Sequence, residues 1–372
     1  MKKKFSNILT ILFLIFVFSI SLLYIFLPKK EFSQTEKRYL AGFPKLSFTT
    51  LTDGSFEEGF EEFLADRTPM RTFFVSVNAY FEYLKGNNGS EGVYLGKEGW
   101  LFEKPFDRDN KFDLNAGKIS RFAKTTDKPV SVMIIPTKGY IYGEYLPKNS
   151  LNYYDGDYLK SLPSKLDGVN VVDVTSAFFN EKGNAQLYYK TDHHWTSAGA
   201  FTAYKALCDS LGLEAADESL YKKEEYGSFR GTSYSTSCYT LTKPDVITLW
   251  RNSKTGGKAK VSIEDSPTPD VYDNMFFPEA LETEDKYVVF LNGNHGIERI
   301  ETGNEGGKLL LIKDSFAHCA VPFLAENYSE IIMVDLRYYK KPVSELLSDD
   351  ISEILFLYGI DTFAESGDII LR

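Results

Sequence analysis

The chain opens with a long apolar stretch over residues 5–27, which three lysines precede and which contains no charged residue. At about 1.5 Å per residue, a helix of this length crosses the roughly 30 Å hydrocarbon core of a membrane. A cleaved signal peptide has a shorter apolar region and small residues at its cleavage site, whereas this stretch ends on Phe26-Leu27-Pro28. We therefore expect an uncleaved transmembrane helix over residues 5–27.

The charges on either side of this stretch predict its orientation. Three lysines and the α-amine precede it, and only Lys29 and Lys30 follow it closely, which favours an N-terminus inside the cell. Residues 1–4 would then form a cytoplasmic tail of a single-pass cell-membrane protein, with the remaining chain extracytoplasmic. A buried core helix is the alternative, but such a helix is rarely apolar on every face.

Residues 28–105 alternate polar linkers with amphipathic patterns. Phenylalanines at helical spacing predict a helix over 55–64, and a second amphipathic helix is expected over 71–84. Residues 93–102 are typical of a β-hairpin that turns at its glycines. This region is interpreted as a linker and a helical stalk.

From residue 106 to residue 372, short apolar runs alternate with helix-like segments. Strands that are apolar on both faces and separated by helices predict a mostly parallel sheet with helices on both sides, an α/β fold. Residues 217–285 are rich in turns and polar residues, and are expected to be an insertion. The predicted strands cover residues 129–136, 169–174, 287–291, 308–312, 330–334 and 353–357.

Composition narrows the possible partners. The formal net charge of −10 repels polyanions, so no nucleic-acid partner is predicted. Aromatic residues make up 15% of the chain, which indicates a folded protein with a large core. Exposed aromatic rings also stack on the apolar faces of sugars, so this richness is compatible with a carbohydrate partner.

A serine follows the apolar run 308–312, in the sequence Lys313-Asp314-Ser315, and a helical pattern follows over 316–326. A serine at a strand-to-helix turn lies at the carboxyl end of the sheet, where α/β folds place their sites. Its hydroxyl would be exposed, and backbone N–H groups at the helix start can hold an oxyanion. A simple helix N-cap is the alternative role for such a serine.

A nucleophilic serine also needs a base and a carboxylate that orients the base. Asp192 and His194 precede a helical pattern over 197–211, and side chains two residues apart in an extended loop point the same way. We predict that Asp192 orients His194, which faces Ser315. Adjacent imidazoles and a carboxylate also suit a metal-dependent phosphoesterase. Since the chain has only four histidines and no Cys-rich or Glu-rich cluster, neither a metal nor another cofactor is predicted.

The motif Asp192-His193-His194-Trp195, together with Lys313-Asp314-Ser315-Phe316, resembles the bacterial DHHW protein family. That family is similar to the SGNH-like alginate O-acetylation proteins, in which an Asp-x-His motif also precedes the serine. The resemblance implies an SGNH-like three-layer α/β/α domain over residues 106–372. It also implies that Ser315 is the nucleophile, His194 the general base and then acid, and Asp192 its orienting carboxylate.

The resemblance suggests further site residues. SGNH enzymes generally form the oxyanion hole from the serine N–H, a glycine N–H and an asparagine, so Asn294 and Gly359 are candidates. This chain has no asparagine beside Gly359. Four further residues are candidates for lining the site: Lys138, Arg337, His193 and Trp195. Each also has a purely structural alternative. The alternative is a solvent-exposed side chain for Lys138, a structural ion pair for Arg337, and core packing for His193 and Trp195.

We expect extracytoplasmic, serine-dependent acyl chemistry, most of all acetyl transfer or ester hydrolysis, on a cell-envelope polysaccharide. The acyl group would come from a small donor or from a membrane-bound donor protein. Transferase and esterase both remain open, because they differ only in whether a sugar or water reaches the acyl-enzyme. The alternative is a catalytically weak, glycan-binding scaffold protein.

Overall fold

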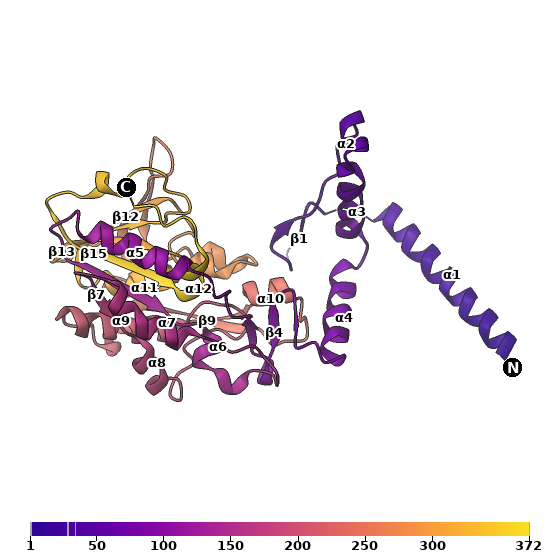
Figure 1. Ribbon diagram of the computed structural model, residues 1–372, viewed down its shortest axis with the longest axis horizontal. Helices are drawn as coiled ribbons and strands as arrows, with labels where there is room; N and C mark the ends of the chain where they lie inside the picture. The colour runs from indigo at the N-terminus through magenta and orange to yellow at the C-terminus, as the bar shows by residue number, and fades with distance from the viewer. Residues whose placement is uncertain (1, 28–29, 34, 372) are drawn as a thin grey trace. The chain divides into compact units, whose positions relative to one another are not determined.

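The computed structural model describes residues 2–27, 30–33 and 35–371. The chain forms two compact units (Figure 1). The first unit comprises the chain up to Ser90 together with Ser235–Thr240, and the second comprises Glu91–Tyr234 and the chain from Leu241 onward. The finer division into tail, anchor, stalk and catalytic domain stays a prediction.

The first unit is mostly helical. Its first helix, α1 (Lys2–Phe26), contains a 22-residue segment with a mean hydropathy of 2.8, long and apolar enough to cross a membrane. The helices expected over 55–64 and 71–84 are confirmed as α3 and α4. The other elements are β1 (Phe32–Ser33), β2 (Arg38–Tyr39), α2 (Phe48–Thr52), α3 (Ser55–Arg67), α4 (Arg71–Leu84) and β3 (Gly89–Ser90).

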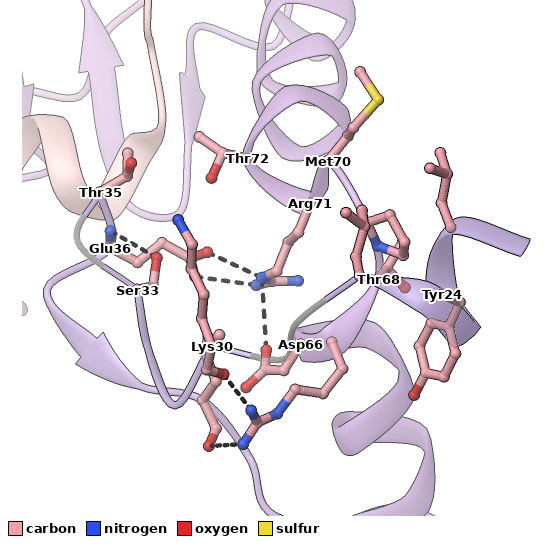
Figure 2. Close-up of a pocket in the computed structure, with 15 residues that line it drawn as sticks. Tyr24, Lys30, Ser33, Thr35, Glu36, Asp66, Thr68, Met70, Arg71 and Thr72 are labelled. Atoms are coloured by element: carbon pink, nitrogen blue, oxygen red, sulfur yellow. Dashed lines mark hydrogen bonds and ion pairs between the residues drawn. The ribbon is translucent and has the colours of Figure 1, made fainter. Parts of the chain in front are cut away.

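A half-buried ion network fixes the junction between α3 and α4. Asp66 accepts two hydrogen bonds from Arg38, at 2.6 and 2.8 Å, and Arg71 binds Glu36 at 2.9 Å. The hydrogen bonds from Arg38 lower the pKa of Asp66 although burial opposes them. Figure 2 shows Arg71 pointing toward Glu36 and Asp66 at a cavity of about 420 Å³. These bonds hold the chain between β1 and β2 against the helix junction.

The second unit is built on an eight-stranded sheet in the order β11-β10-β12-β14-β13-β15-β6-β7. Five neighbouring strands, from β14 to β7, pair in parallel, and the remaining three pair antiparallel at one edge. The mostly parallel sheet predicted from the sequence is therefore confirmed. Its strands are β6 (Val130–Ile135), β7 (Asn170–Val172), β10 (Lys258–Ile263), β11 (Asp270–Asn274), β12 (Ile297–Glu301), β13 (Gly307–Lys313), β14 (Tyr328–Val334) and β15 (Ile351–Gly359).

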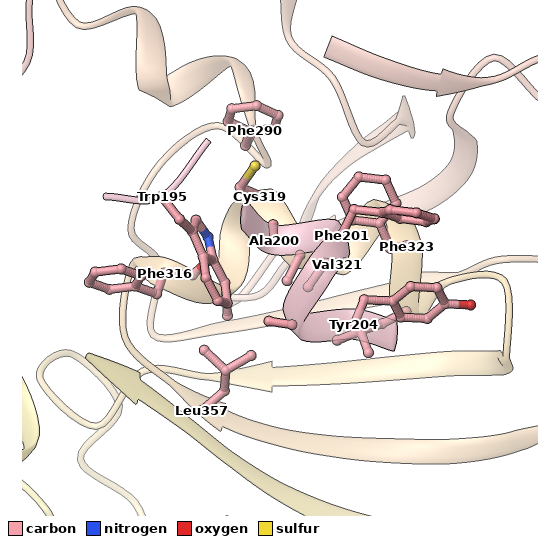
Figure 3. Packing of buried hydrophobic residues seen from close by; sticks show 14 of the residues in the cluster. Trp195, Ala200, Phe201, Tyr204, Phe290, Phe316, Cys319, Val321, Phe323 and Leu357 are labelled. Carbon is pink, nitrogen blue, oxygen red and sulfur yellow. The ribbon is translucent and has the colours of Figure 1, made fainter. Parts of the chain in front are cut away.

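Helices cover both faces of this sheet, because the strand side chains alternate between two cores. Leu309 and Leu311 pack in one core with the helices α8, α9 and α11, whereas Leu310 and Ile312 pack in the other with α5 and α12. Figure 3 shows aromatic residues of α9 and α11 packed together in the first core. This is the three-layer α/β/α arrangement. The helices are α5 (Lys111–Ala123), α8 (Thr175–Glu181), α9 (Ser197–Leu211), α11 (Phe316–Leu324) and α12 (Ile360–Glu365).

Smaller elements complete the second unit. The hairpin expected over 93–102 is confirmed as the antiparallel pair β4 and β5. A second antiparallel pair, β8 and β9, lies outside the main sheet. The bounds are β4 (Val93–Leu95), β5 (Leu101–Glu103), α6 (Lys138–Ile141), α7 (Asp155–Ser161), β8 (Tyr221–Phe229), α10 (Thr232–Ser237), which continues into the first unit, and β9 (Asp245–Asn252).

One predicted strand is wrong. Residues 287–291 form a 3-10 turn, Lys286–Val289, and a single bridge between Phe290 and Phe276. Leu291 and Asn292 follow with φ angles of +56° and +58°, which an extended strand does not allow. A short apolar run has no periodicity that separates a strand from a buried turn, which explains the error.

Candidate active site

Three parallel strands bring the candidate residues to one edge of the sheet. Ile312 on β13 pairs with Phe356 on β15, and Tyr358 pairs with Ile134 on β6. The carboxyl ends of these strands therefore lie side by side, with β15 in the middle, and Ser315 follows β13. Open α/β sheets bind their ligands at the carboxyl ends of their strands.

The loop before α9 is held by buried hydrogen bonds. The Asp245 carboxylate, at the start of β9, accepts the backbone N–H groups of Lys190 and Thr191 at 2.9 and 2.7 Å. The Thr196 hydroxyl caps α9 by accepting the N–H of Gly199. Because both ends of the loop are fixed, residues 192–195 keep one conformation at the start of the helix.

Asp192, His194 and Ser315 form a continuous hydrogen-bonded line. Asp192 Oδ1 lies 2.6 Å from His194 Nδ1, and His194 Nε2 lies 2.7 Å from Ser315 Oγ. The carboxylate assigns the proton of the imidazole to Nδ1, which leaves Nε2 free to accept the serine proton. Asp192 and His194 are buried, whereas Ser315 is partly exposed. A substrate can thus approach the serine while the other two groups stay dry.

The second oxygen of Asp192 is held by the start of α10. Oδ2 accepts hydrogen bonds from the backbone N–H of Thr232 at 2.7 Å and from its hydroxyl at 3.2 Å. Burial opposes ionisation of Asp192, but the electrostatic interactions with His194 and His193 and the hydrogen bonds from His194 hold its pKa well below the usual range. The carboxylate is therefore ionised at neutral pH.

Gly231 allows this contact, because a Cβ at that position would lie 2.1 Å from the Asp192 side chain. We expect Gly231→Ala to destabilise the protein by about 1–3 kcal/mol, the usual penalty of overpacking, and to displace Asp192. Gly227→Ala is the matched control, since a Cβ there meets no atom within 4 Å. Thermal unfolding of both variants tests this expectation; equal melting temperatures for the two would contradict it.

The His194 ring is covered by Tyr287. The two rings stack with centroids 4.1 Å apart, and the tyrosine hydroxyl donates to the Ser315 carbonyl at 3.3 Å. Burial first, and then the neighbouring His193, lower the pKa of His194, and Asp192 only partly opposes them. The imidazole is accordingly neutral at neutral pH, which is the form that can take a proton.

This environment predicts the pH dependence of the reaction. A general base acts only while it is unprotonated. Because the pKa of His194 is lowered from 6.5, the acid limb of kcat/KM for p-nitrophenyl acetate should lie below pH 6.5. His193→Gln removes a repelling charge and should move the limb to higher pH. A limb above pH 6.5 in the wild type, or a shift to lower pH in the variant, would count against this electrostatic account.

The Asp314 carboxylate holds the backbone around Ser315 in place. It accepts the N–H of Phe316 at 2.9 Å and that of Gly359 at 2.8 Å, and so joins the start of α11 to the end of β15. Burial raises the pKa of Asp314 to about 6, although these two hydrogen bonds favour its charged form. The Gly359 N–H, a predicted oxyanion donor, is thereby occupied. The N–H of Ser315 donates to no acceptor among the described residues and remains available.

Three of the weaker candidates lie next to the triad. The Lys138 ammonium is buried and donates to the carbonyl of Asp192 at 2.6 Å, so it is not solvated. His193 Nδ1 lies 2.5 Å from the Thr232 hydroxyl. Trp195 is fully buried and donates its indole N–H to the Phe316 carbonyl at 3.0 Å, as a core residue does. Lys138 and Trp195 therefore brace the loop.

Asn294 and Arg337 bind each other. The Arg337 guanidinium forms an ion pair with Asp335 at 2.7 Å and donates to Asn294 Oδ1 at 3.1 Å. The structural ion pair that was the alternative role for Arg337 is therefore present. Asn294 is exposed, and its role as an oxyanion donor stays a prediction.

The metal alternative concerns Asp192, His193 and His194, whose candidate ligand atoms lie within 4.8 Å of one another. Both oxygens of Asp192 and the Nδ1 atoms of both histidines already take part in hydrogen bonds. Nε2 of His194 faces Ser315. These atoms fit a proton-transfer chain better than a metal site, because coordination would break bonds that hold the loop.

Sequence patterns did not reveal several residues that shape this site. Thr232 and Asp245 lie in the region interpreted as an insertion, where no periodicity points to the triad. Tyr287 lies in the run that was taken for a strand. Only Asp314 carried a signal, since it stands beside Ser315 at a strand end.

The fold and the site define a three-layer α/β protein with a Ser–His–Asp constellation at the carboxyl edge of its parallel sheet. The DHHW protein family matches residues 118–334, which is more than half of the 372 residues. The chain therefore belongs to the DHHW protein family, as the resemblance of its motifs indicated.

Curated relatives have modest identity. A protein of Pseudomonas putida named probable alginate O-acetylase AlgJ is 25% identical over 191 residues, which is 47% of this chain and 48% of the relative. Its namesake in Pseudomonas aeruginosa is 24% identical over 175 residues, or 45% of each chain. The chain spans about half the length of the curated relatives it matches.

Solved structures confirm the fold. A DHHW family protein from Eubacterium siraeum superposes with a TM-score of 0.66 and 25% identity, over 75% of this chain and 94% of the other. PatB1 of Bacillus cereus superposes with a TM-score of 0.62 and 19% identity, over 75% of this chain and 99% of the other. At this identity PatB1 is evidence for the fold alone.

Proposed function

We propose that this protein is a membrane-anchored, extracytoplasmic O-acyltransferase that uses Ser315 to pass an acetyl group to a hydroxyl of a cell-envelope polysaccharide. The hydrogen-bonded line from Asp192 through His194 to Ser315 is the observation that carries the proposal. The relatives named alginate O-acetylase support the substrate class. Helix α1 supplies a segment that can hold the protein at a membrane.

The geometry gives each group a step. Ser315 Oγ attacks the carbonyl carbon of an acetyl donor while His194 Nε2 takes the hydroxyl proton, and the departing donor group then receives that proton. The acetyl group is now esterified to Ser315. A sugar hydroxyl attacks this ester, gives its proton to His194, and leaves as the acetylated sugar while the proton returns to Ser315. Asp192 stabilises the imidazolium in both halves, and the Ser315 N–H faces the developing oxyanion.

The same acyl-enzyme yields hydrolysis if water attacks in place of the sugar. The donor can be a small ester, a thioester or a membrane-bound acyl-carrying protein, since the first half-reaction needs only a reactive acetyl carbonyl. No step requires a cofactor. Transfer and hydrolysis therefore share one intermediate and differ in the second half-reaction alone.

The proposal is tested with the full-length protein in detergent micelles, with p-nitrophenyl acetate as donor and short oligosaccharides as acceptors. We expect p-nitrophenol release and acetylated oligosaccharides, both absent with Ser315→Ala. Release without acetylated sugar would reduce the function to an esterase. No release, combined with oligosaccharide binding that survives in the variant, would instead select a scaffold protein.

The proposed location has its own test. Protease added to intact spheroplasts should digest the second unit, because that unit is expected outside the membrane. Its protection until the cells are lysed would refute the orientation.

A further inference from the structure

A cavity of about 180 Å³ lies in the second unit beside the catalytic constellation. Its wall includes His193 and Phe316, the chain neighbours of His194 and Ser315, together with the end of β6 and residues of α12. The volume is below the roughly 300 Å³ at which typical small-molecule pockets begin, so it suits one ring rather than several. The cavity could therefore hold the sugar unit next to the one whose hydroxyl reacts.

Carboxylates dominate the charge of this cavity. Glu103, Asp361 and Glu365 line it, and the cations are Lys104 and Lys138. Among the described residues, neither Asp361 nor Glu365 forms an ion pair. The Lys104 ammonium lies over the Tyr94 ring, 5.8 Å from its centroid.

Lys138 cannot neutralise the negative charge of a ligand bound in the cavity. Its ammonium has three protons, and its three partners are the Asp192 carbonyl at 2.6 Å, the Ser233 hydroxyl at 3.0 Å and Glu103 at 3.5 Å. It therefore neutralises Glu103 and has no donor left to bind an anion in the cavity.

Asp361 and Glu365 remain as a pair of like charges, and at Glu365 only the backbone N–H of Asp107 and the charge of Lys111, which forms no ion pair with it among the described residues, favour the ionised form. The two carboxylates lie one turn apart on α12, where residues four positions apart are neighbours. Asp361 also lies close to the reacting centre, because a Cβ built on Gly359 would meet both its Oδ1, at 2.8 Å, and the Phe316 ring, at 2.7 Å. Burial, and then the charge of Asp361, raise the pKa of Glu365, as expected for like charges held together.

We infer that this cavity selects the acceptor by charge: it takes a sugar that carries a protonated amine and rejects a sugar that carries a carboxylate. An ammonium group relieves the repulsion between Asp361 and Glu365, whereas a uronate adds a third negative charge. The inference rests on the proposed function, because the cavity is an acceptor subsite only if Ser315 transfers an acyl group. Alginate is therefore not the expected acceptor of this protein, because its sugar units carry carboxylates.

Binding to full-length Ser315→Ala protein tests the inference without turnover. Isothermal titration compares short oligosaccharides of equal length: glucosamine oligomers, neutral cello-oligomers and mannuronate oligomers. We expect the amine ligand to bind at least about tenfold more tightly than the uronate, with the neutral ligand between them. Adding Asp361→Asn and Glu365→Gln should remove most of that difference.

The matched control neutralises two exposed carboxylates outside the cavity, by Glu345→Gln and Asp349→Asn, and so changes the net charge equally. The preference should survive in this control. Glu365→Gln alone, at an exposed position, serves if the double variant folds poorly, and should reduce the preference in part. Equal affinities for amine and uronate, no binding of any ligand, or an equal loss in the control would overturn the inference.

The two proposals can fail separately. If Ser315 acquires an acetyl group in the wild type but no charge preference is found, only the acceptor assignment fails. If the preference depends on Asp361 and Glu365 but Ser315 is never acetylated, the proposed reaction fails, and the cavity is a binding site for amino sugars alone.

Discussion

Ser315→Ala should lower the rate of p-nitrophenyl acetate hydrolysis by about 10³-fold or more, because the reaction then has no nucleophile. Folding should be unaffected, since the hydroxyl bonds only to His194 among the described side chains. Initial rates of p-nitrophenol release, compared with thermal unfolding curves, measure both effects.

Ser176→Ala is the control for this experiment. Ser176 is an exposed serine on α8, away from the triad, and its loss should leave the rate unchanged. A Ser315→Ala protein that retains more than about a tenth of the wild-type rate would show that Ser315 does not carry the acyl group.

Asp192→Asn is expected to have the second largest effect, a loss of about 10³- to 10⁴-fold in kcat. The amide cannot stabilise the imidazolium, and its NH₂ group would face either His194 Nδ1 or the Thr232 N–H. In the first case His194 takes the wrong tautomer, and in the second a buried donor loses its acceptor, at a cost of about 1–3 kcal/mol in stability. Rates and urea unfolding of the variant measure the two losses.

The exposed carboxylate Asp349 provides the comparison. Asp349→Asn makes the same chemical change outside the site, so neither its rate nor its stability should change measurably. If Asp192→Asn kept wild-type activity, Asp192 would have no role in orienting the base.

The sequence predicted most of the fold because the strands of a covered parallel sheet are apolar on both faces. Residues 308–312 and 353–357 are such runs, and both are central strands of the sheet. The antiparallel edge was harder to predict. Strand β12 has three charged residues among its five, and β10 and β11 lie in the region interpreted as an insertion.

The hydrogen-bonded arrangement of Asp192, His194 and Ser315 could be predicted because its two halves carry local signals. The spacing of Asp192 and His194 and the position of Ser315 after a buried strand depend only on neighbouring residues. Contacts between distant segments have no such signal. Thr232 reaches Asp192 across 40 positions, and Tyr287 reaches Ser315 across 28. Only tertiary packing brings these residues together.

The oxyanion donors are the least predictable part of the site. Gly359 stands at the expected strand end, but its N–H binds Asp314, a contact that no motif encodes. The N–H of Ser315 is the donor that the geometry leaves available. Asn294 stays a predicted second donor.

Mass spectrometry of peptides from the acetylated protein shows directly whether Ser315 carries the acyl group. The full-length protein is mixed briefly with p-nitrophenyl acetate, quenched in acid and digested, and the modified peptide is sequenced. We expect one acetyl group on Ser315 in the wild type, and none at this position in Ser315→Ala or His194→Ala. Acetylation confined to lysines, or equal labelling of the wild type and both variants, would contradict it.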